Sequence, residues 1–431
     1  MITGRDMAIA ASLPAMPQAP VRSVAERILI LVLFVTVLAS SIAFIEPSPH
    51  DGLMAVLALA CVTAGVRFQR MLIIPLALLV IWNVAGLLAL IPVIGQEKTV
   101  QYTGTSIYLA IAALLFACIF SQNTMPRLAA TRTAYVLTAS VIALAGIAGY
   151  FSLFPGAHGL FAPFDRALGA FKDPNVFGPF LIWPTLIVLE RIVARRIRMI
   201  DIAVIGILSL GVLVSFSRGA WFHAAVSGVV MLSLVFLTAP TQRARVRIFN
   251  VGVVGILALA AFIAILLSFE SIRTMFEQRA QLFQYYDVGD GGRFNLQQLA
   301  LSAVLNFPNG MGPLEFGRVH GLQQHNVYLQ AFLVYGWVGG MAYIVLLLAT
   351  LWIGFRTLFV RTPWQPYLIT AYSAFVGEAL EGLVIDTDHW RHFYLLLGVI
   401  WGLATATVNQ SRQTPMPARR HPDVVFHVRA A

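Results

Sequence analysis

The feature that most constrains the fold of this chain is a series of long apolar runs between residues 28 and 408. Most are close to the roughly 20 residues that an α-helix needs to cross a bilayer. The runs lie at 28–45, 53–66, 71–94, 105–120, 134–154, 174–190, 199–215, 220–238, 247–269, 325–355, 366–385 and 392–408. Only 11% of the residues are charged, whereas a soluble domain carries roughly 25%. The sequence therefore predicts an all-α polytopic membrane protein with about twelve transmembrane helices, the second of them short.

The basic residues are unevenly distributed among the segments that connect these runs, and this distribution predicts the topology. Cytoplasmic connections of membrane proteins are enriched in Lys and Arg. With the N-terminus inside, the inner segments hold 20 of the 29 basic residues. The chain then divides into a cytoplasmic tail at 1–27, spans one to nine at 28–269, an outer loop at 270–324, spans ten to twelve at 325–408 and a second cytoplasmic tail at 409–431. The net charge of +10 is thus an orientation signal, and we expect no nucleic-acid partner.

Two of the predicted outer loops, 155–173 and 270–324, are long enough to form a site. Loops of more than about 15 residues are usually functional or disordered, and the apolar and aromatic content of these two argues against disorder. Within the second loop, Phe294 to Leu305 has the apolar spacing of a short helix that lies on the membrane surface.

Two arginines stand at predicted outer ends of spans. Arg218 lies in the short turn between the seventh and eighth runs, and Arg293 directly precedes the helix predicted at 294–305. A guanidinium can hold a phosphate through two parallel hydrogen bonds, so both arginines are candidates for binding one. Each also has a plainer explanation: Arg218 could contact lipid phosphates, and Arg293 could begin a helix without binding any ligand.

His325 and Asn326 lie where the long outer loop enters the tenth run, with His325 predicted as the first residue of the span. The macrodipole at a helix N-terminus disfavours imidazolium, which keeps the ring neutral and able to accept a proton. His325 is therefore a candidate general base, although a histidine there could also simply cap or solvate the helix. The run from Val327 to Phe355 is longer than a bilayer requires, so its helix tilts, bends at Gly336, Gly339 or Gly340, or projects outward.

Further polar residues stand near the same predicted face. Asp173-Pro174-Asn175 is typical of a helix cap, with a substrate role for Asn175 as the alternative, and Arg166 lies close by in the first long loop. Glu378 and Glu381 fall on one face of the eleventh span. Two acids on a membrane helix suit a proton-coupled transporter, but they could equally pair with Arg218, Arg293 or Arg391 and hold the site in shape.

We predict neither a metal site nor a cofactor. Cys61 and Cys118 lie in apolar runs and behave as small hydrophobic residues. Asp386 and His389 have no recognised metal-ligand spacing.

Four short motifs resemble elements of the O-antigen ligase and polymerase superfamily of bacterial polytopic glycosyltransferases. Ser217-Arg218-Gly219 is similar to the family's Ser-Arg-Gly turn, and His325-Asn326-x-Tyr328-Leu329 followed by Gly336-x-x-Gly339 is similar to its most specific signature. The other two resemblances are Phe171-Lys-Asp-Pro-Asn175, before the sixth span, and Gly292-Arg293 with Pro308-x-Gly310-x-Gly312, in the large loop. The resemblance implies a GT-C-like helical fold in a bacterial inner membrane, with the active site facing the periplasm.

The resemblance also implies the reaction. A glycan carried on undecaprenyl pyrophosphate would be transferred to an acceptor hydroxyl, with inversion and without a metal. Arg218 and Arg293 would bind the pyrophosphate, and His325 would deprotonate the acceptor, which makes these three the candidate catalytic residues. The candidate substrate-binding residues are Asn326, Asn175, Arg166, Tyr328, Glu378 and Glu381.

Three questions stay open at the level of sequence. A ligase would use lipid A-core as acceptor and a polymerase another lipid-linked glycan, as in O-antigen or exopolysaccharide biosynthesis, and the motifs do not separate the two. A transporter or flippase for a lipid-linked or anionic substrate is the alternative function, and it would depend on Glu378 and Glu381 more than on His325. A non-catalytic assembly scaffold is a third possibility.

Overall fold

The computed structural model describes residues 24–194, 197–281, 287, 289 and 292–413. These residues form helices joined by turns, and the described part of the chain contains no strand. Most of the two predicted tails lies outside the described residues. The all-helical class predicted from the apolar runs is therefore confirmed.

Every predicted apolar run is helical over most of its length. The helices are α1 (Val24–Leu38), α2 (Pro49–Thr63), α3 (Ile73–Leu90), α4 (Glu97–Phe120), α5 (Thr124–Tyr150), α7 (Pro174–Phe180), α8 (Ile182–Ala194), α9 (Met199–Val214), α10 (Arg218–Thr238), α11 (Gln242–Leu266), α16 (Val327–Leu358), α17 (Gln365–Glu381) and α18 (Arg391–Gln413). The sixth run forms two helices, because Pro179 and Pro184 lie within it and a proline ring interrupts the helical hydrogen bonds of the preceding turn.

Among the described residues, nine helical segments are long and apolar enough to cross a membrane. The short second run forms α2, with 15 residues, and α9 is also short, with 16. The chain is thus a polytopic membrane protein, and twelve spans remains a prediction.

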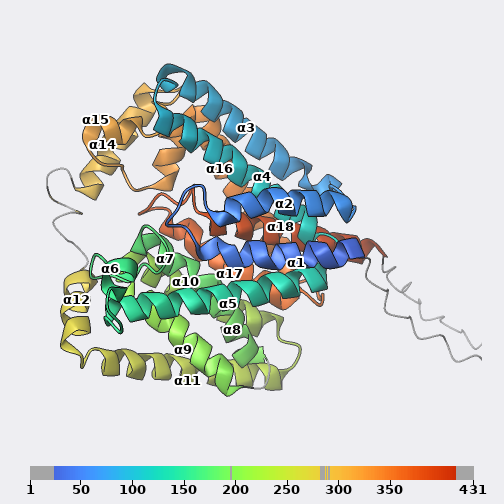
Figure 1. Cartoon of the computed structure of the whole chain (residues 1–431). Coiled ribbons are helices and arrows are strands. Elements are labelled where there is room, and N and C mark those ends of the chain that lie inside the picture. Colours follow the sequence, from blue (N-terminus) through green and yellow to red (C-terminus); the bar gives the residue numbers. More distant parts are fainter. Residues whose placement is uncertain (1–23, 195–196, 282–286, 288, 290–291, 414–431) are drawn as a thin grey trace, which may run out of the picture.

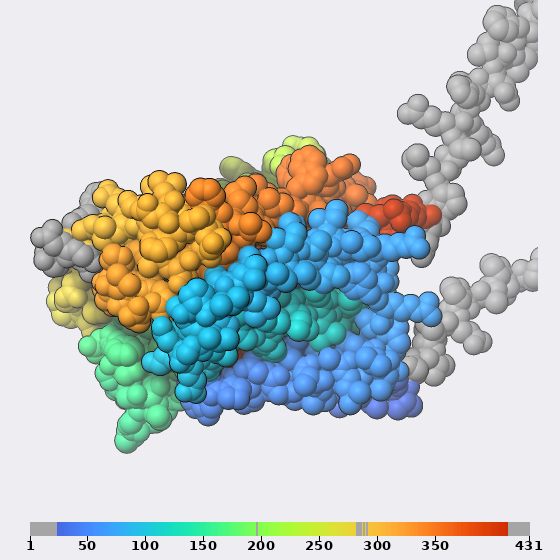
Figure 2. Space-filling view, turned by 90° about the horizontal axis from the view of Figure 1, so that it is seen from above, coloured from blue at the N-terminus to red at the C-terminus, as the bar shows by residue number. Residues whose placement is uncertain are grey.

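The two predicted outer loops lie at the same end of the molecule. Loop 155–173 contains α6 (Ala157–Phe161), and loop 270–324 contains α12 (Glu270–Ala280), α14 (Arg293–Asn306) and α15 (Glu315–His320). Figure 1 shows α6, α12, α14 and α15 at the end opposite the start of α1. In Figure 2 the yellow and orange residues of the large loop again lie opposite the red end of α18. Which side of the membrane this end faces stays a prediction.

The helices differ greatly in how much of their surface is buried. In α18, 89% of the apolar window is buried, and this helix packs against α4, α16 and α17. In α11 only 6% is buried, so this helix lies at the periphery, against α8 and α10. Since lipid is as apolar as these side chains, an exposed apolar helix is what a bilayer accommodates.

The long helix α16 bends at Gly336, one of the three outcomes that its length predicted. Gly336 has φ 66° and ψ −175°, a conformation that only glycine adopts readily. The segment 308–312 of the large loop packs into this bend: Trp337 N donates to Pro308 O at 2.8 Å, and Met311 N donates to Leu333 O at 2.7 Å. A Cβ on Gly336 would lie 2.8 Å from Pro308 O. The glycines of the predicted motif therefore allow loop and helix to approach closely.

Candidate functional site

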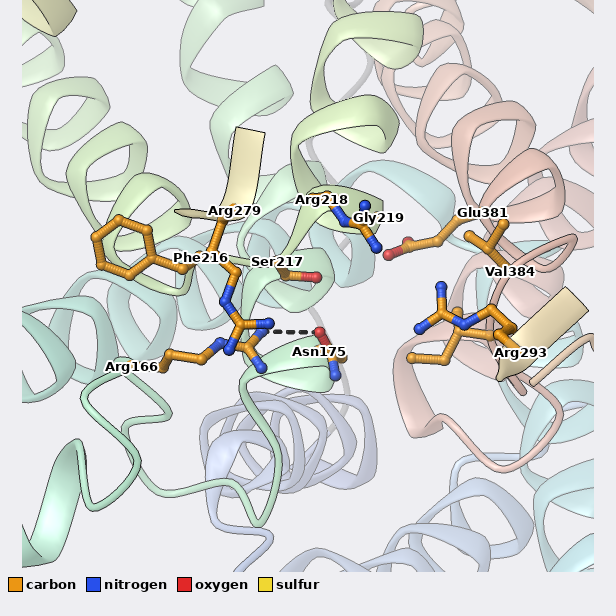
Figure 3. Close-up of a pocket in the computed structure, with 11 residues that line it drawn as sticks. Arg166, Asn175, Phe216, Ser217, Arg218, Gly219, Arg279, Arg293, Glu381 and Val384 are labelled. Atoms are coloured by element: carbon orange, nitrogen blue, oxygen red, sulfur yellow. Dashed lines mark hydrogen bonds between the residues drawn. The ribbon is translucent and has the colours of Figure 1, made fainter. Parts of the chain in front are cut away.

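A cavity of about 260 Å³ opens at the end of the molecule that carries the two long loops. Helices α7, α10, α12, α14 and α17, the loop before α7 and the turns before α10 and after α17 contribute to its wall, and Figure 3 shows the lining side chains. Its lining residues are Arg166, Asn175, Phe216, Ser217, Arg218, Gly219, Arg279, Arg293, Glu381, Val384 and Ile385. Four of them are arginines and one is a carboxylate, so the cavity is strongly basic. We call it the arginine pocket.

Arg218 is the first residue of α10. The hydroxyl of Ser217 caps this helix by accepting a hydrogen bond from Ala220 N. The guanidinium of Arg218 donates to Gln281 O at 2.9 Å and to the Asp287 carboxylate at 2.5 Å. The structure thus brings Arg218 into the pocket and directs its fork at oxygen acceptors.

Arg293 is the first residue of α14, and it contacts the same carboxylate as Arg218. The distance from Arg293 Nη1 to Asp287 Oδ1 is 3.8 Å, and the Asp287 side chain is only 3% exposed. Two arginines from distant parts of the sequence therefore converge on one anionic group. The helix predicted at 294–305 begins one residue earlier, at Arg293.

Asn175 and Arg166 are joined to each other inside the pocket. The predicted cap is present, since the Asp173 carboxylate accepts from Asn175 N at 2.7 Å. The Asn175 side-chain oxygen then accepts from Arg166 Nη2 at 2.9 Å, and Arg166 Nε donates to Ser215 O at 2.8 Å. Asn175 therefore orients an arginine of the pocket.

Arg279 belongs to the pocket but was not selected from the sequence. It lies in the last turn of α12, and no resemblance motif includes it. The available signal was weak: Arg279 is a basic residue in a loop where basic residues are scarce.

His325 lies beside the arginine pocket and is not among its lining residues. The prediction that His325 begins the tenth span is wrong, because α16 begins at Val327 with Asn326 as its N-cap. The side-chain oxygen of Asn326 accepts from the backbone N–H groups of Tyr328 and Leu329, which fixes the helix start there. His325 itself has a left-handed backbone, with φ 49°, and its side chain is 42% exposed.

A turn between α17 and α18 links the pocket to His325. Val384 and Ile385 line the pocket, and the next residue, Asp386, places its Oδ2 3.5 Å from His325 Nδ1. The other Asp386 oxygen accepts from Asn326 N at 3.0 Å. Burial raises the pKa of the Asp386 carboxyl. This partner of His325 was noticed in the sequence only as an unsuitable metal ligand.

The other candidates at the start of α16, its N-cap Asn326 and Tyr328, make intramolecular hydrogen bonds. Asn326 Nδ2 donates to Leu383 O at 3.0 Å, and Tyr328 OH donates to Ala379 O at 2.6 Å. Both side chains thus tie the start of α16 to the end of α17 and to the turn that follows it, and neither lines the arginine pocket.

The two glutamates of α17 contact histidines. Glu381 lines the pocket, and its Oε2 lies 2.8 Å from His223 Nδ1. Glu378, one turn deeper, is fully buried, with Oε1 3.4 Å from His392 Nε2. The predicted pairing of these acids with Arg391 is wrong, because Arg391 binds Asp51 through two hydrogen bonds of 2.9 and 2.8 Å.

Within the described residues, no group of three or more His, Cys, Asp or Glu side chains is arranged to hold a metal ion. The independence of the reaction from metal remains a prediction.

The fold and this site define a polytopic membrane protein with a basic pocket at the ends of its helices. A family model described as O-antigen ligase matches residues 203–344, which run from α9 into α16 and include Arg218, Arg293 and His325. This segment is therefore similar to the O-antigen ligase family, and the resemblance to the O-antigen ligase and polymerase superfamily is confirmed. No curated protein matches the chain. The match supports a function of the O-antigen ligase or polymerase type.

Proposed function

We propose that this protein is a membrane glycosyltransferase that moves a glycan from undecaprenyl pyrophosphate to an acceptor hydroxyl at the periplasmic membrane surface. The acceptor is lipid A-core in a ligase and a second lipid-linked glycan in a polymerase. The observation that carries the proposal is the convergence of Arg218 and Arg293 on the single buried carboxylate of Asp287.

This convergence supports an anionic donor. A carboxylate resembles one face of a phosphate, and two guanidinium groups directed at one such group can share its charge. The pocket also contains Arg166 and Arg279, so a pyrophosphate would meet further positive charge. In the proposed complex the pyrophosphate of the donor takes the position that the Asp287 carboxylate holds when no donor is bound.

The proposed chemistry is a single displacement. His325 accepts the proton of the acceptor hydroxyl, the acceptor oxygen forms a bond to the anomeric carbon, and the bond from that carbon to the pyrophosphate oxygen breaks. The lipid pyrophosphate leaves with the electron pair, and the arginines stabilise its charge. Direct attack inverts the anomeric centre.

The contact between His325 and Asp386 supports the role of base. With Nδ1 directed at the carboxylate, Nε2 is the nitrogen left to accept a proton, and an imidazolium formed during transfer would have a counter-charge beside it. General-base assistance of this kind is worth about 10²–10⁴-fold in rate.

The test is a transfer assay with purified protein in lipid nanodiscs. The donor, an undecaprenyl-pyrophosphate-linked repeat unit, is supplied first alone and then with lipid A-core. Longer lipid-linked products from donor alone identify a polymerase, and glycan only on lipid A-core identifies a ligase. We expect His325→Ala to lose at least about 100-fold in rate and His320→Ala, on the exposed end of α15, to remain active. Absence of product with either acceptor would reject the proposal.

A second candidate function is a transporter or flippase for an anionic or lipid-linked substrate. The observation that supports it is the two buried glutamate–histidine pairs, because ionisable pairs in membrane helices are typical of proton relays. The two functions predict opposite rankings of variants. In a transporter Glu378→Gln abolishes activity and His325→Ala is tolerated, whereas in a transferase His325→Ala is the more damaging change.

A further inference from the structure

Gln297, on helix α14, makes two hydrogen bonds that join the two halves of the site. Its side-chain Nε2 donates to His325 O at 3.2 Å and to Leu383 O at 3.3 Å. His325 is the candidate base. Leu383 directly precedes Val384 and Ile385, which line the arginine pocket. One amide group therefore fixes the backbone on both sides of the junction between pocket and histidine.

The same helix carries Arg293. Residues four apart lie on one face of an α-helix, so Arg293 and Gln297 occupy neighbouring positions on successive turns of α14. Arg293 directs its guanidinium into the pocket, while Gln297 contacts the backbone of His325. The position of α14 thus determines both where the arginine lies and where the histidine lies.

α14 is held in this position by a separate set of contacts. Trp337 Nε1 donates to Val304 O at 2.7 Å, near the C-terminal end of the helix. The buried face of α14 forms a small apolar cluster with Phe316 and Leu333. The fold of α14 therefore does not depend on Gln297, and a change at this position leaves its packing in place.

His325 needs such support because of its backbone. A residue other than glycine with φ 49° is in a sparsely populated conformation that persists only when surrounding contacts hold it. The peptide group that joins His325 to Asn326 is held by two hydrogen bonds. Gln297 Nε2 donates to the carbonyl oxygen of His325, and the N–H of Asn326 donates to Asp386 Oδ1. Loss of the Gln297 contact releases one side of this peptide group.

We propose that Gln297 is a positioning residue of the transfer reaction, which holds the backbone of His325 at a fixed place relative to the donor arginine at the start of the same helix. This inference rests on the proposed glycosyl transfer. It assigns Gln297 no contact with the substrate. It predicts an effect on the rate of transfer, since a misplacement of about 1 Å can reduce the rate about 100-fold.

The test compares Gln297→Met with Gln298→Met. Methionine has a similar length and helix propensity but cannot donate a hydrogen bond, and Gln298 is exposed on the same helix. We expect Gln297→Met to lower kcat about 10- to 100-fold, with the donor KM changed less than about threefold and the melting temperature unchanged. Gln298→Met should match the wild-type protein in all three. A wild-type kcat in Gln297→Met, a fall in melting temperature that parallels kcat, or a change in donor KM alone would each overturn the inference.

A second readout does not depend on activity. Carbethoxylation of His325 is followed by peptide mass spectrometry, with His320 as internal reference. Gln297→Met should change the modification rate of His325 several-fold and leave that of His320 unchanged. An unchanged rate in the variant overturns the positioning role even if no transfer activity is found, whereas a changed rate with an inactive wild-type protein would reject only the proposed function.

Discussion

Replacing Arg218 with lysine separates a guanidinium fork from a simple positive charge. The two terminal nitrogens of Arg218 reach two different acceptors, Gln281 O at 2.9 Å and Asp287 Oδ2 at 2.5 Å. The single nitrogen of a lysine keeps the charge but cannot reproduce this planar, two-pronged geometry. In the proposed complex the same fork would span two oxygens of the pyrophosphate.

The size of the effect follows from the loss of one of the two hydrogen bonds that the fork would make to the pyrophosphate. A hydrogen bond to a charged group contributes about 1.5–3 kcal/mol, and about 1.4 kcal/mol corresponds to tenfold. The Arg218 side chain is 24% exposed, so solvent weakens the interaction only in part. We therefore expect Arg218→Lys to reduce kcat/KM for the donor about 10- to 100-fold, and Arg218→Ala to reduce it by a similar or larger factor.

The assay is the transfer reaction in nanodiscs at several donor concentrations, with Arg273→Lys as the matched control. Arg273 lies on the exposed surface of α12 and pairs with Glu270 of the same helix, so its exchange should leave kcat/KM unchanged. A value for Arg218→Lys within about threefold of wild type would refute the fork argument. It would indicate that Arg218 acts as a point charge or contacts only lipid headgroups.

Three further changes have defined outcomes. Gly336→Ala should destabilise the protein by about 1–3 kcal/mol, because the new Cβ would lie 2.8 Å from Asn309 C and Pro308 O. Thermal unfolding in detergent measures this change. Gly228→Ala is the control: its Cβ meets nothing within 4 Å, and alanine is the better helix former, so this variant should not be destabilised. Burial raises the pKa of the Asp386 carboxyl, so this group should become protonated, and its contact with His325 should weaken, at a pH above the usual range of a free aspartate. Transfer activity should therefore fall on the acid side of the pH profile. In Asp386→Asn this acid limb of the kcat/KM profile should be absent. EDTA should leave transfer unchanged, and a loss that Mg²⁺ restores would contradict charge stabilisation by arginine alone.

The helical class and the order of helices were predictable from the sequence, because apolar runs of membrane-spanning length have few other stable solutions in lipid. Details that depend on neighbouring segments were less accessible. The length of the tenth run indicated a tilt, a bend or a projection, and only the packing of segment 308–312 against Gly336 explains the bend. The start of α16 was misplaced by two residues because the cap is Asn326, whose side chain, and not that of His325, reaches the first free N–H groups.

The candidate site was partly predictable. Arg218, Arg293, Asn175 and Arg166 were selected from motifs or from predicted helix ends, and the structure brings all four into one pocket. Arg279 was missed, since its place depends on the packing of α12 against the start of α10, where Phe276 stacks on Trp221, and no local pattern encodes this contact. Contacts between residues far apart in sequence, such as Asp386 with His325, leave no periodic signal in either segment.

The Ser217-Arg218-Gly219 motif acquires a physical meaning from its surroundings. Ser217 caps α10, which frees Arg218 from any capping role and leaves its side chain for the pocket. Gly219 leaves room for an acid, since a Cβ there would lie 2.6 Å from Glu381 Oε1. His223, one turn further along α10, holds the other oxygen of that carboxylate. Helix α10 therefore supplies the arginine and also fixes the position of the acid that lines the same pocket, so the motif acts as a unit in which each residue has a separate task.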